Sequence, residues 1–187
     1  MHDFDVVGLI KYDFLTLLLV NMAAGMFILS LFFMRGVSGE IRTTWAPPFA
    51  ISGLAALGGG TFITFAWPLP DPYNIVFGEM SVFYGLLLLG AALAVAKHYD
   101  LLGLGIFAMF AGAAAVLIGV RIWNLGLTAK PIMSAAGFIL SGAGGIFAGL
   151  ALASRLAVLR ILTSICFLLA AGIWALTGYM AYWMHMG

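Results

Sequence analysis

The sequence predicts an all-α integral membrane protein, folded as a six-transmembrane-helix bundle with short loops. Six apolar segments of roughly 20 residues fill most of the 187-residue chain, and a hydrocarbon layer of ~30 Å needs about 20 helical residues to cross it. The composition is 64% hydrophobic and only 8% charged, and the mean hydropathy is +1.15. The charged residues lie mostly between the apolar segments. These observations predict a single transmembrane domain over residues 1–187.

The spans are predicted, in order, at residues 14–34, 47–67, 75–96, 101–123, 132–153 and 158–180. Aspartates precede the first span, and Arg35 follows it without a small-residue cleavage site, so we expect a retained helix rather than a signal peptide. Between the second and third spans, the prolines of the loop from Trp67 to Pro72 end one helix and delay the next. The connections are short, so consecutive helices are expected to be antiparallel neighbours.

The basic residues predict the orientation of the bundle. One side of the membrane receives Arg35, Arg42, Lys97, Arg155 and Arg160, and the other receives Lys11, Arg121 and Lys130. By the positive-inside rule, the side with five basic residues is cytoplasmic, which places both termini outside. The expected location is the cell (plasma) membrane.

Small residues recur at helical spacing and predict where helices pack closely. Helices in lipid associate through close packing of small side chains and through interhelical hydrogen bonds. The fifth span carries such a face every four residues, at Gly137, Ser141, Gly145 and Gly149. The fourth span carries Gly105, Gly112 and Gly119 at seven-residue spacing. Such faces more commonly pack against other helices. The alternative is that they form the wall of a narrow conduit.

Two ionised side chains, Glu79 and Arg121, lie well inside predicted spans. Each lies a turn or two below the outer end of its helix, so their depths in the membrane are comparable. A lone charge near mid-membrane costs ~2.5–3.5 kcal/mol on insertion scales, so pairing is the favourable arrangement. We therefore predict that the two side chains meet. The pair could join the third and fourth helices, line the vestibule of a solute path, or do both.

Three further side chains are candidates for a polar site or a pore. Asn74 is predicted near the outer end of the third span, where it either caps the chain or contacts a solute. Asn21 is a polar group inside the first span and is expected to bond across helices or to line a cavity. Trp174 belongs to a stripe along the sixth span that suits either core packing or an aromatic constriction.

Composition and residue placement weaken several classes of function. A net charge of +1 without clustered Lys and Arg gives no basis for binding nucleic acid. The three histidines, His2, His98 and His185, all lie outside the middle of the spans, which argues against haem and against a metal site. Every aspartate is predicted in a loop or terminus, so no intramembrane protease pair is expected. We expect no cofactor and no enzyme activity.

Several short motifs resemble parts of known families. Phe83-Tyr84-Gly85, the turn Lys97-His98-Tyr99-Asp100 and the run from Leu125 to Thr128 before a glycine-rich helix resemble parts of the urea/amide channel and acetate uptake families. The stretches 67–90 and 119–128 more closely resemble small archaeal and bacterial membrane proteins of unassigned function. The channel resemblance implies a ring of protomers, commonly a hexamer, in which Phe83 and Tyr84 line or adjoin the pore. Trp45-Ala46-Pro47-Pro48 departs from the acetate family's Asn-Pro-Ala-Pro motif, so selectivity for acetate is not implied.

The function expected from these features is a passive channel or facilitator for a small neutral or weakly acidic solute, working as a homo-oligomer in the lipid bilayer. The alternative is a non-catalytic membrane subunit that anchors or stabilises a larger complex, for which the short loops and glycine faces offer surfaces for partner subunits. A third hypothesis is an enzyme or carrier acting on a lipid or quinone, with Glu79 and Arg121 as its polar groups.

Overall fold

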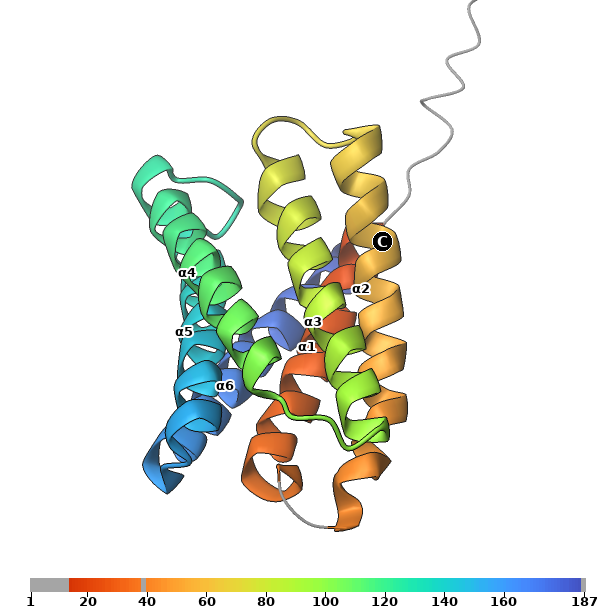
Figure 1. Ribbon diagram of the computed structural model, residues 1–187. Helices are drawn as coiled ribbons and strands as arrows, with labels where there is room; N and C mark the ends of the chain where they lie inside the picture. Colours follow the sequence, from red (N-terminus) through yellow and green to blue (C-terminus); the bar gives the residue numbers. More distant parts are fainter. Residues whose placement is uncertain (1–13, 38–39, 186–187) are drawn as a thin grey trace, which may run out of the picture.

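The computed structural model describes residues 14–37 and 40–185 and is built from six long helices (Figure 1). The helices are α1 (Phe14–Leu31), α2 (Ala46–Ala66), α3 (Met80–Ala96), α4 (Leu102–Leu125), α5 (Pro131–Ser154) and α6 (Ala157–His185). Three short helical segments adjoin them: η2 (Phe32–Gly36), η3 (Glu40–Trp45) and η4 (Asn74–Glu79). No strand occurs within the described ranges, so the all-α prediction is confirmed.

Six of these helices are long and apolar enough to cross a membrane, which makes the chain a multi-pass membrane protein. When η2 is counted with α1 and η4 with α3, most predicted boundaries lie within two residues of the observed helix ends. The sixth helix is the exception, because it continues to His185 instead of ending near Met180. The segment Ala181 to His185 contains no Gly or Pro, so nothing in the sequence breaks the helix there. His2, Lys11 and the aspartates before Phe14 lie outside the described residues.

Local sequence explains where several helices begin and end. Prolines occupy the first turns of α2 and α5, where a helix has no use for the missing N–H. The carboxyl end of α4 is closed by Gly126 at φ 62°, a left-handed conformation that glycine adopts without a steric cost. These signals are local, and the sequence alone reveals them.

The helices form three closely packed pairs, α2 with α3, α4 with α5, and α1 with α6. Figure 1 shows the α4–α5 pair on one side and the α2–α3 pair on the other, with α6 running diagonally behind both. α5 also packs closely on α6, whereas α3 and α4 make few contacts although they are consecutive in the sequence. The expectation that consecutive helices pack as neighbours therefore holds for α2–α3, α4–α5 and α5–α6, less for α1–α2, and only weakly for α3–α4.

The α4–α5 pair is held by contact between glycines. A Cβ atom added at Gly112 would collide with the carbonyl oxygen of Gly142, and one added at Gly142 would collide with that of Gly112. One turn away, a Cβ on Gly145 would lie 2.9 Å from the carbonyl oxygen of Ala108. The two backbones touch along this face, as small residues allow in a membrane.

The α1–α6 pair is joined by hydrogen bonds between serines. Ser30 Oγ donates to the carbonyl oxygen of Ser164 at 2.9 Å, Ser164 Oγ donates to that of Ser30 at 3.0 Å, and the two hydroxyl oxygens are 2.8 Å apart. Both serines are buried. Interhelical bonds of this kind stabilise helix association where no water is available.

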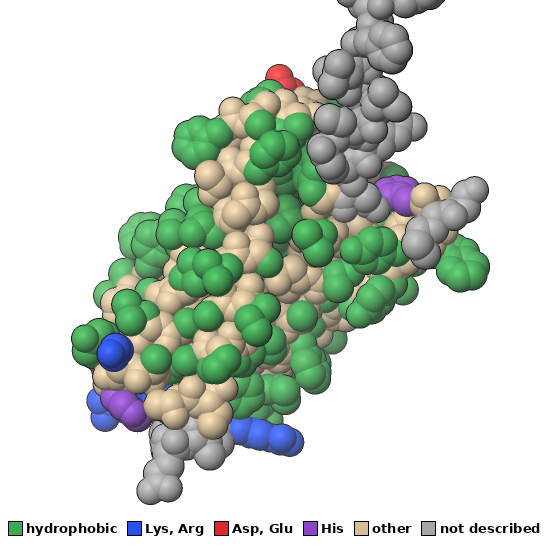
Figure 2. Space-filling view, turned by 90° about the vertical axis from the view of Figure 1, so that its right-hand side faces the viewer, with side chains coloured by type: hydrophobic (Ala, Val, Ile, Leu, Met, Phe, Trp, Pro, Cys, Tyr) green, Lys and Arg blue, Asp and Glu red, His purple; other side chains and the backbone are tan. Residues whose placement is uncertain are grey.

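The charged side chains separate toward the two ends of the bundle. Figure 2 shows Lys and Arg at the lower end and an acidic side chain at the upper end, with apolar side chains covering the surface between them. The end where α1 leads to α2, α3 to α4 and α5 to α6 carries Arg35, Arg42, Lys97, Arg155 and Arg160, and we call it the basic end. By the positive-inside rule the basic end is predicted to face the cytoplasm.

Candidate functional site

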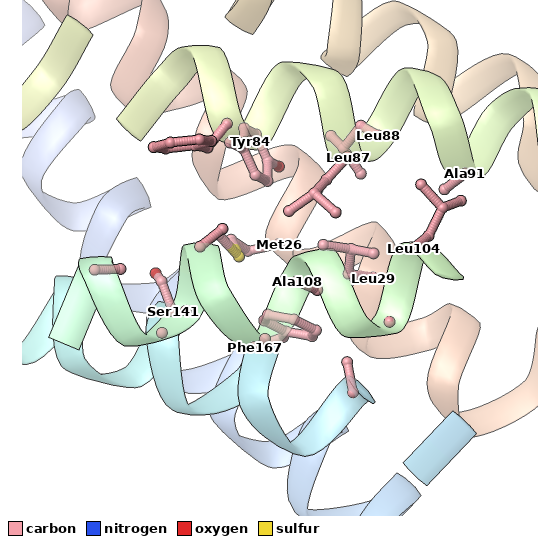
Figure 3. Close-up of a pocket in the computed structure, with 18 of the residues that line it drawn as sticks. Met26, Leu29, Tyr84, Leu87, Leu88, Ala91, Leu104, Ala108, Ser141 and Phe167 are labelled. Carbon is pink, nitrogen blue, oxygen red and sulfur yellow. The ribbon is translucent and has the colours of Figure 1, made fainter. Parts of the chain in front are cut away.

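A cavity of about 140 Å³ lies inside the bundle and is lined by residues of all six helices. Its lining extends along α5 from Phe138 to Leu152, which corresponds to about 20 Å of helix at 1.5 Å per residue. The cavity is therefore long and narrow, and it runs along the helices. Figure 3 shows side chains of α3 and α4 facing each other across this space, with Met26 and Leu29 of α1 between them.

The wall of the cavity is almost entirely apolar. Among the described residues that line it, only Tyr84 and Ser141 carry a polar side-chain atom. The Ser141 hydroxyl is already engaged, since it donates to the carbonyl oxygen of Gly137 at 2.7 Å and accepts from Trp174 Nε1 at 3.0 Å. A dry, apolar interior follows, because an apolar cavity of about 150 Å³ in another protein stays empty of water and binds benzene.

The cavity is open on the side where α3 and α4 meet. Its lining residues on α1, α2, α5 and α6 are mostly buried, whereas Phe83, Leu87 and Ala91 on α3 are half-buried. The lining residues Leu104 and Ala108 on α4 are half-buried as well. Both α3 and α4 belong to the helices that are long and apolar enough to cross a membrane.

Two contacts bridge the open side. The rings of Phe83 on α3 and Phe107 on α4 lie with their centroids 6.0 Å apart. Toward the basic end, Leu104 leans against Gly90, where an added Cβ would come within 2.6 Å of Leu104 Cδ2. Both contacts involve flexible apolar side chains rather than hydrogen bonds.

Phe83 and Tyr84, the two positions that the channel resemblance singled out, both line the cavity. Tyr84 is buried, and its hydroxyl lies with Ser52 Oγ against Gly25 on α1. Within the described residues, the Tyr84 hydroxyl meets no acceptor or donor at hydrogen-bonding geometry. Ser52 Oγ donates to the carbonyl oxygen of Asn21 at 3.4 Å.

Two of the predicted polar candidates have structural partners outside the cavity. Asn74 is fully buried, and its side chain binds both the N–H and the carbonyl oxygen of Leu69. It therefore fixes the loop between α2 and α3. Asn21 donates to the carbonyl oxygen of Ser52 at 3.0 Å and so links α1 to α2.

Trp174 supports the cavity wall from behind. It is 1% exposed, donates to Ser141 and packs edge-to-face on Phe138 with ring centroids 5.1 Å apart. Gly137 makes room for it, because an added Cβ there would lie 2.8 Å from Trp174 Cζ2. Of the predicted small face on α5, Gly137 and Ser141 thus contact α6, whereas Gly145 and Gly149 contact α4.

The predicted meeting of Glu79 and Arg121 does not occur. Over the described part of the chain, neither side chain takes part in an ion pair or hydrogen bond. Arg121 is exposed, on the same outward face of α4 as Leu117, which lies one turn before it. The prediction was wrong because equal depth in the membrane does not bring two side chains together when their helices make few contacts.

The comparisons with known proteins identify the family of the chain but not its activity. Residues 10–187 match a family described as "Protein of unknown function (DUF981)". The chain belongs to this family. No curated protein and no solved structure matches it. The expected resemblance to urea/amide channels and to the acetate uptake family receives no support from these comparisons.

For this DUF981 protein, the cavity is the feature on which a function can be argued. Sequence reasoning missed four of the residues by which α4 lines the cavity, Leu104, Ala108, Ala111 and Ala115. The signal was present, since Leu104, Ala108, Ala111 and Ala115 recur at intervals of three and four residues, but such spacing is shared by any packed helix face. In the described ranges, no group of three His, Cys, Asp or Glu side chains could hold a metal ion.

Proposed function

We propose that this protein binds a membrane-soluble molecule by placing the molecule's hydrocarbon part in the central cavity. The observation that carries the proposal is the apolar wall, interrupted by only two polar side chains among the described residues that line the cavity. Burial of apolar surface stabilises by about 25 cal/mol per Å², so a hydrocarbon chain is a suitable occupant. The half-buried residues between α3 and α4 supply the route from the lipid.

A photolabelling experiment tests this proposal. The probe is hexadecanol carrying a diazirine in mid-chain, incorporated into nanodiscs with the purified protein, and the labelled residues are mapped by mass spectrometry. We expect adducts on cavity residues such as Met26 and Leu104. Labelling confined to lipid-facing residues such as Phe110 and Leu117, which are 76% and 64% exposed, would overturn the proposal.

A matched pair of variants makes the test specific to the cavity. Ala108→Leu adds bulk to a lining position, whereas Ala113→Leu makes the same change on the exposed face of the same helix. We expect Ala108→Leu to lower cavity labelling severalfold and Ala113→Leu to leave it unchanged. Equal labelling in the two variants would contradict occupation of the cavity.

The second candidate is the passive channel expected from the sequence, working as a homo-oligomer. It is supported by one observation, that the cavity lies inside a single bundle and runs along the helices. The apolar wall opposes it, because moving an amide or hydroxyl group into an environment without hydrogen-bond partners costs about 2–7 kcal/mol. Stopped-flow uptake of urea, acetamide and acetate into proteoliposomes decides between the candidates. Permeability above that of protein-free vesicles would favour the channel.

A further inference from the structure

The cavity ends, toward the basic end of the bundle, at residues that are held by two arginines. Phe33 lines the cavity, and its carbonyl oxygen accepts a hydrogen bond from Arg160 Nε at 3.3 Å. Leu101 also lines the cavity, and two residues before it the carbonyl oxygen of Tyr99 accepts from Arg42 Nη2 at 2.6 Å. The Arg160 guanidinium therefore lies one contact beyond the apolar wall, and the Arg42 guanidinium lies against the turn that leads into Leu101.

The same region contains two buried N–H groups that lack an acceptor. Within the described residues, Arg42 Nε and Trp45 Nε1 are both buried without a hydrogen-bond partner. They belong to η3, a 3₁₀ helix, in which side chains three residues apart project from the same side. The Trp45 ring packs on Phe32, which also lines the cavity, at a centroid distance of 6.0 Å. No protein atom in the described ranges satisfies either donor, so each remains available to an acceptor on a bound molecule.

The charge around these donors favours an anion. Arg35, Lys97 and Arg155 lie at the same end of the bundle. Two acidic residues also belong to this end, against the five basic ones. Glu40 lies in η3, two positions before Arg42, and Asp100 Oδ1 accepts from the N–H of Leu102 at 2.7 Å. Arginine binds carboxylates and phosphates through paired N–H donors, and such charge-assisted bonds are stronger than neutral ones.

We propose that the molecule bound in the cavity is an anionic amphiphile, with its carboxylate or phosphate headgroup at Arg42 and Arg160 and its hydrocarbon chain in the cavity. This inference rests on the proposed function, because it names the chemical class of the occupant. A headgroup oxygen at the basic end supplies the acceptor that Arg42 Nε and Trp45 Nε1 lack. The apolar wall then receives the part of the chain nearest the headgroup, and the remainder passes between α3 and α4.

The test compares two photoreactive probes that differ only in the headgroup. Hexadecanoic acid and hexadecanol, each with a mid-chain diazirine, compete for the protein in nanodiscs at pH 8. We expect the acid to label the cavity about tenfold more efficiently than the alcohol, as hydrogen bonds to a charged headgroup predict. Equal labelling of the cavity by both probes would overturn the proposal that the bound molecule has an anionic headgroup, while leaving the proposed function intact.

Variants locate the headgroup. Exchanging both Arg42→Gln and Arg160→Gln should abolish the preference for the acid, and labelling by the alcohol in the same variant reports whether the cavity is still formed. Trp45→Phe, which removes only the indole N–H, should lower the preference severalfold. Arg155→Gln makes the same charge change at the basic end on an exposed side chain and should have no effect. A preference retained in the double variant would overturn the assignment.

Competition with inorganic phosphate distinguishes a site for an amphiphile from a site for a simple anion. An excess of inorganic phosphate should not displace the acid, since the chain contributes most of the binding. Displacement of the acid by inorganic phosphate would overturn the proposal that the bound molecule is an amphiphile. Absence of cavity labelling by either probe would instead contradict the proposed function itself, so the two failures are distinguishable.

Discussion

Single glycines in this protein differ sharply in what surrounds them. At Gly137 the space for a Cβ is already filled by the Trp174 indole, whereas at Gly172 no atom lies within 4 Å of that position. Both residues lie inside long helices, α5 and α6. The two positions therefore separate the effect of close packing from the intrinsic effect of glycine on a helix.

We predict that Gly137→Ala destabilises the protein by about 1–3 kcal/mol, because the indole is fully packed and hydrogen-bonded and cannot move away. Gly172→Ala should be neutral or stabilise by up to about 1 kcal/mol, since alanine has the higher helix propensity. Thermal unfolding in detergent measures both. Equal losses in the two variants would contradict the packing described for Gly137.

Glu79 and Arg121 are predicted to act independently of each other. Because no ion pair joins them, a double-mutant cycle with Glu79→Gln and Arg121→Gln should give a coupling energy below about 0.5 kcal/mol. The cycle of Ser141→Ala with Trp174→Phe serves as the positive control. It should give about 1 kcal/mol or more, since these side chains share a buried hydrogen bond of 3.0 Å. Strong coupling of the charged pair would show that they meet.

At the scale of elements, the α4–α5 pair depends on direct contact between backbones. Gly112→Ala places a methyl group against the carbonyl oxygen of Gly142, and backbone cannot rotate away as a side chain can. We expect the free energy of unfolding to fall by about 2–3 kcal/mol, or the variant to fail to fold. Gly103→Ala on the same helix, where no atom lies within 4 Å, is the control and should be close to neutral. Unfolding by denaturant, monitored by tryptophan fluorescence, measures the difference.

The sequence was sufficient to predict where the helices lie along the chain, but it was not sufficient to predict which helices pack together. Apolar length and helix-breaking residues locate each span, as Pro131 and Gly126 illustrate at the ends of α5 and α4. Which helices pack together depends on contacts between distant segments, such as Ser30 with Ser164. For that reason the depth of Glu79 and Arg121 was predictable and their separation was not. The cavity lining on α4 was missed because its apolar spacing resembles that of ordinary core packing.

At the scale of the whole molecule, the charge separation predicts which end faces the cytoplasm. In a background with Cys166→Ser, Ser154→Cys introduces a thiol at the basic end, and Ala129→Cys introduces one at the opposite end. Neither change alters a charge, so the orientation itself is undisturbed. We expect a membrane-impermeant maleimide to label Ala129→Cys on intact cells and Ser154→Cys only after permeabilisation. The reverse pattern would invert the predicted topology.

The serine contact between α1 and α6 has a consequence for biogenesis in the cell. Ser30 and Ser164 are 134 positions apart, and translation proceeds at ~5–20 residues per second, so α1 waits on the order of 10 s for its partner to emerge from the ribosome. During that interval its hydroxyl can bond only within α1, to a carbonyl oxygen one turn back, as Ser141 does with Gly137 in α5. A chain interrupted before α6 would lack this contact and leave α1 packed mainly on α2, so α1 would be held only weakly in the bundle.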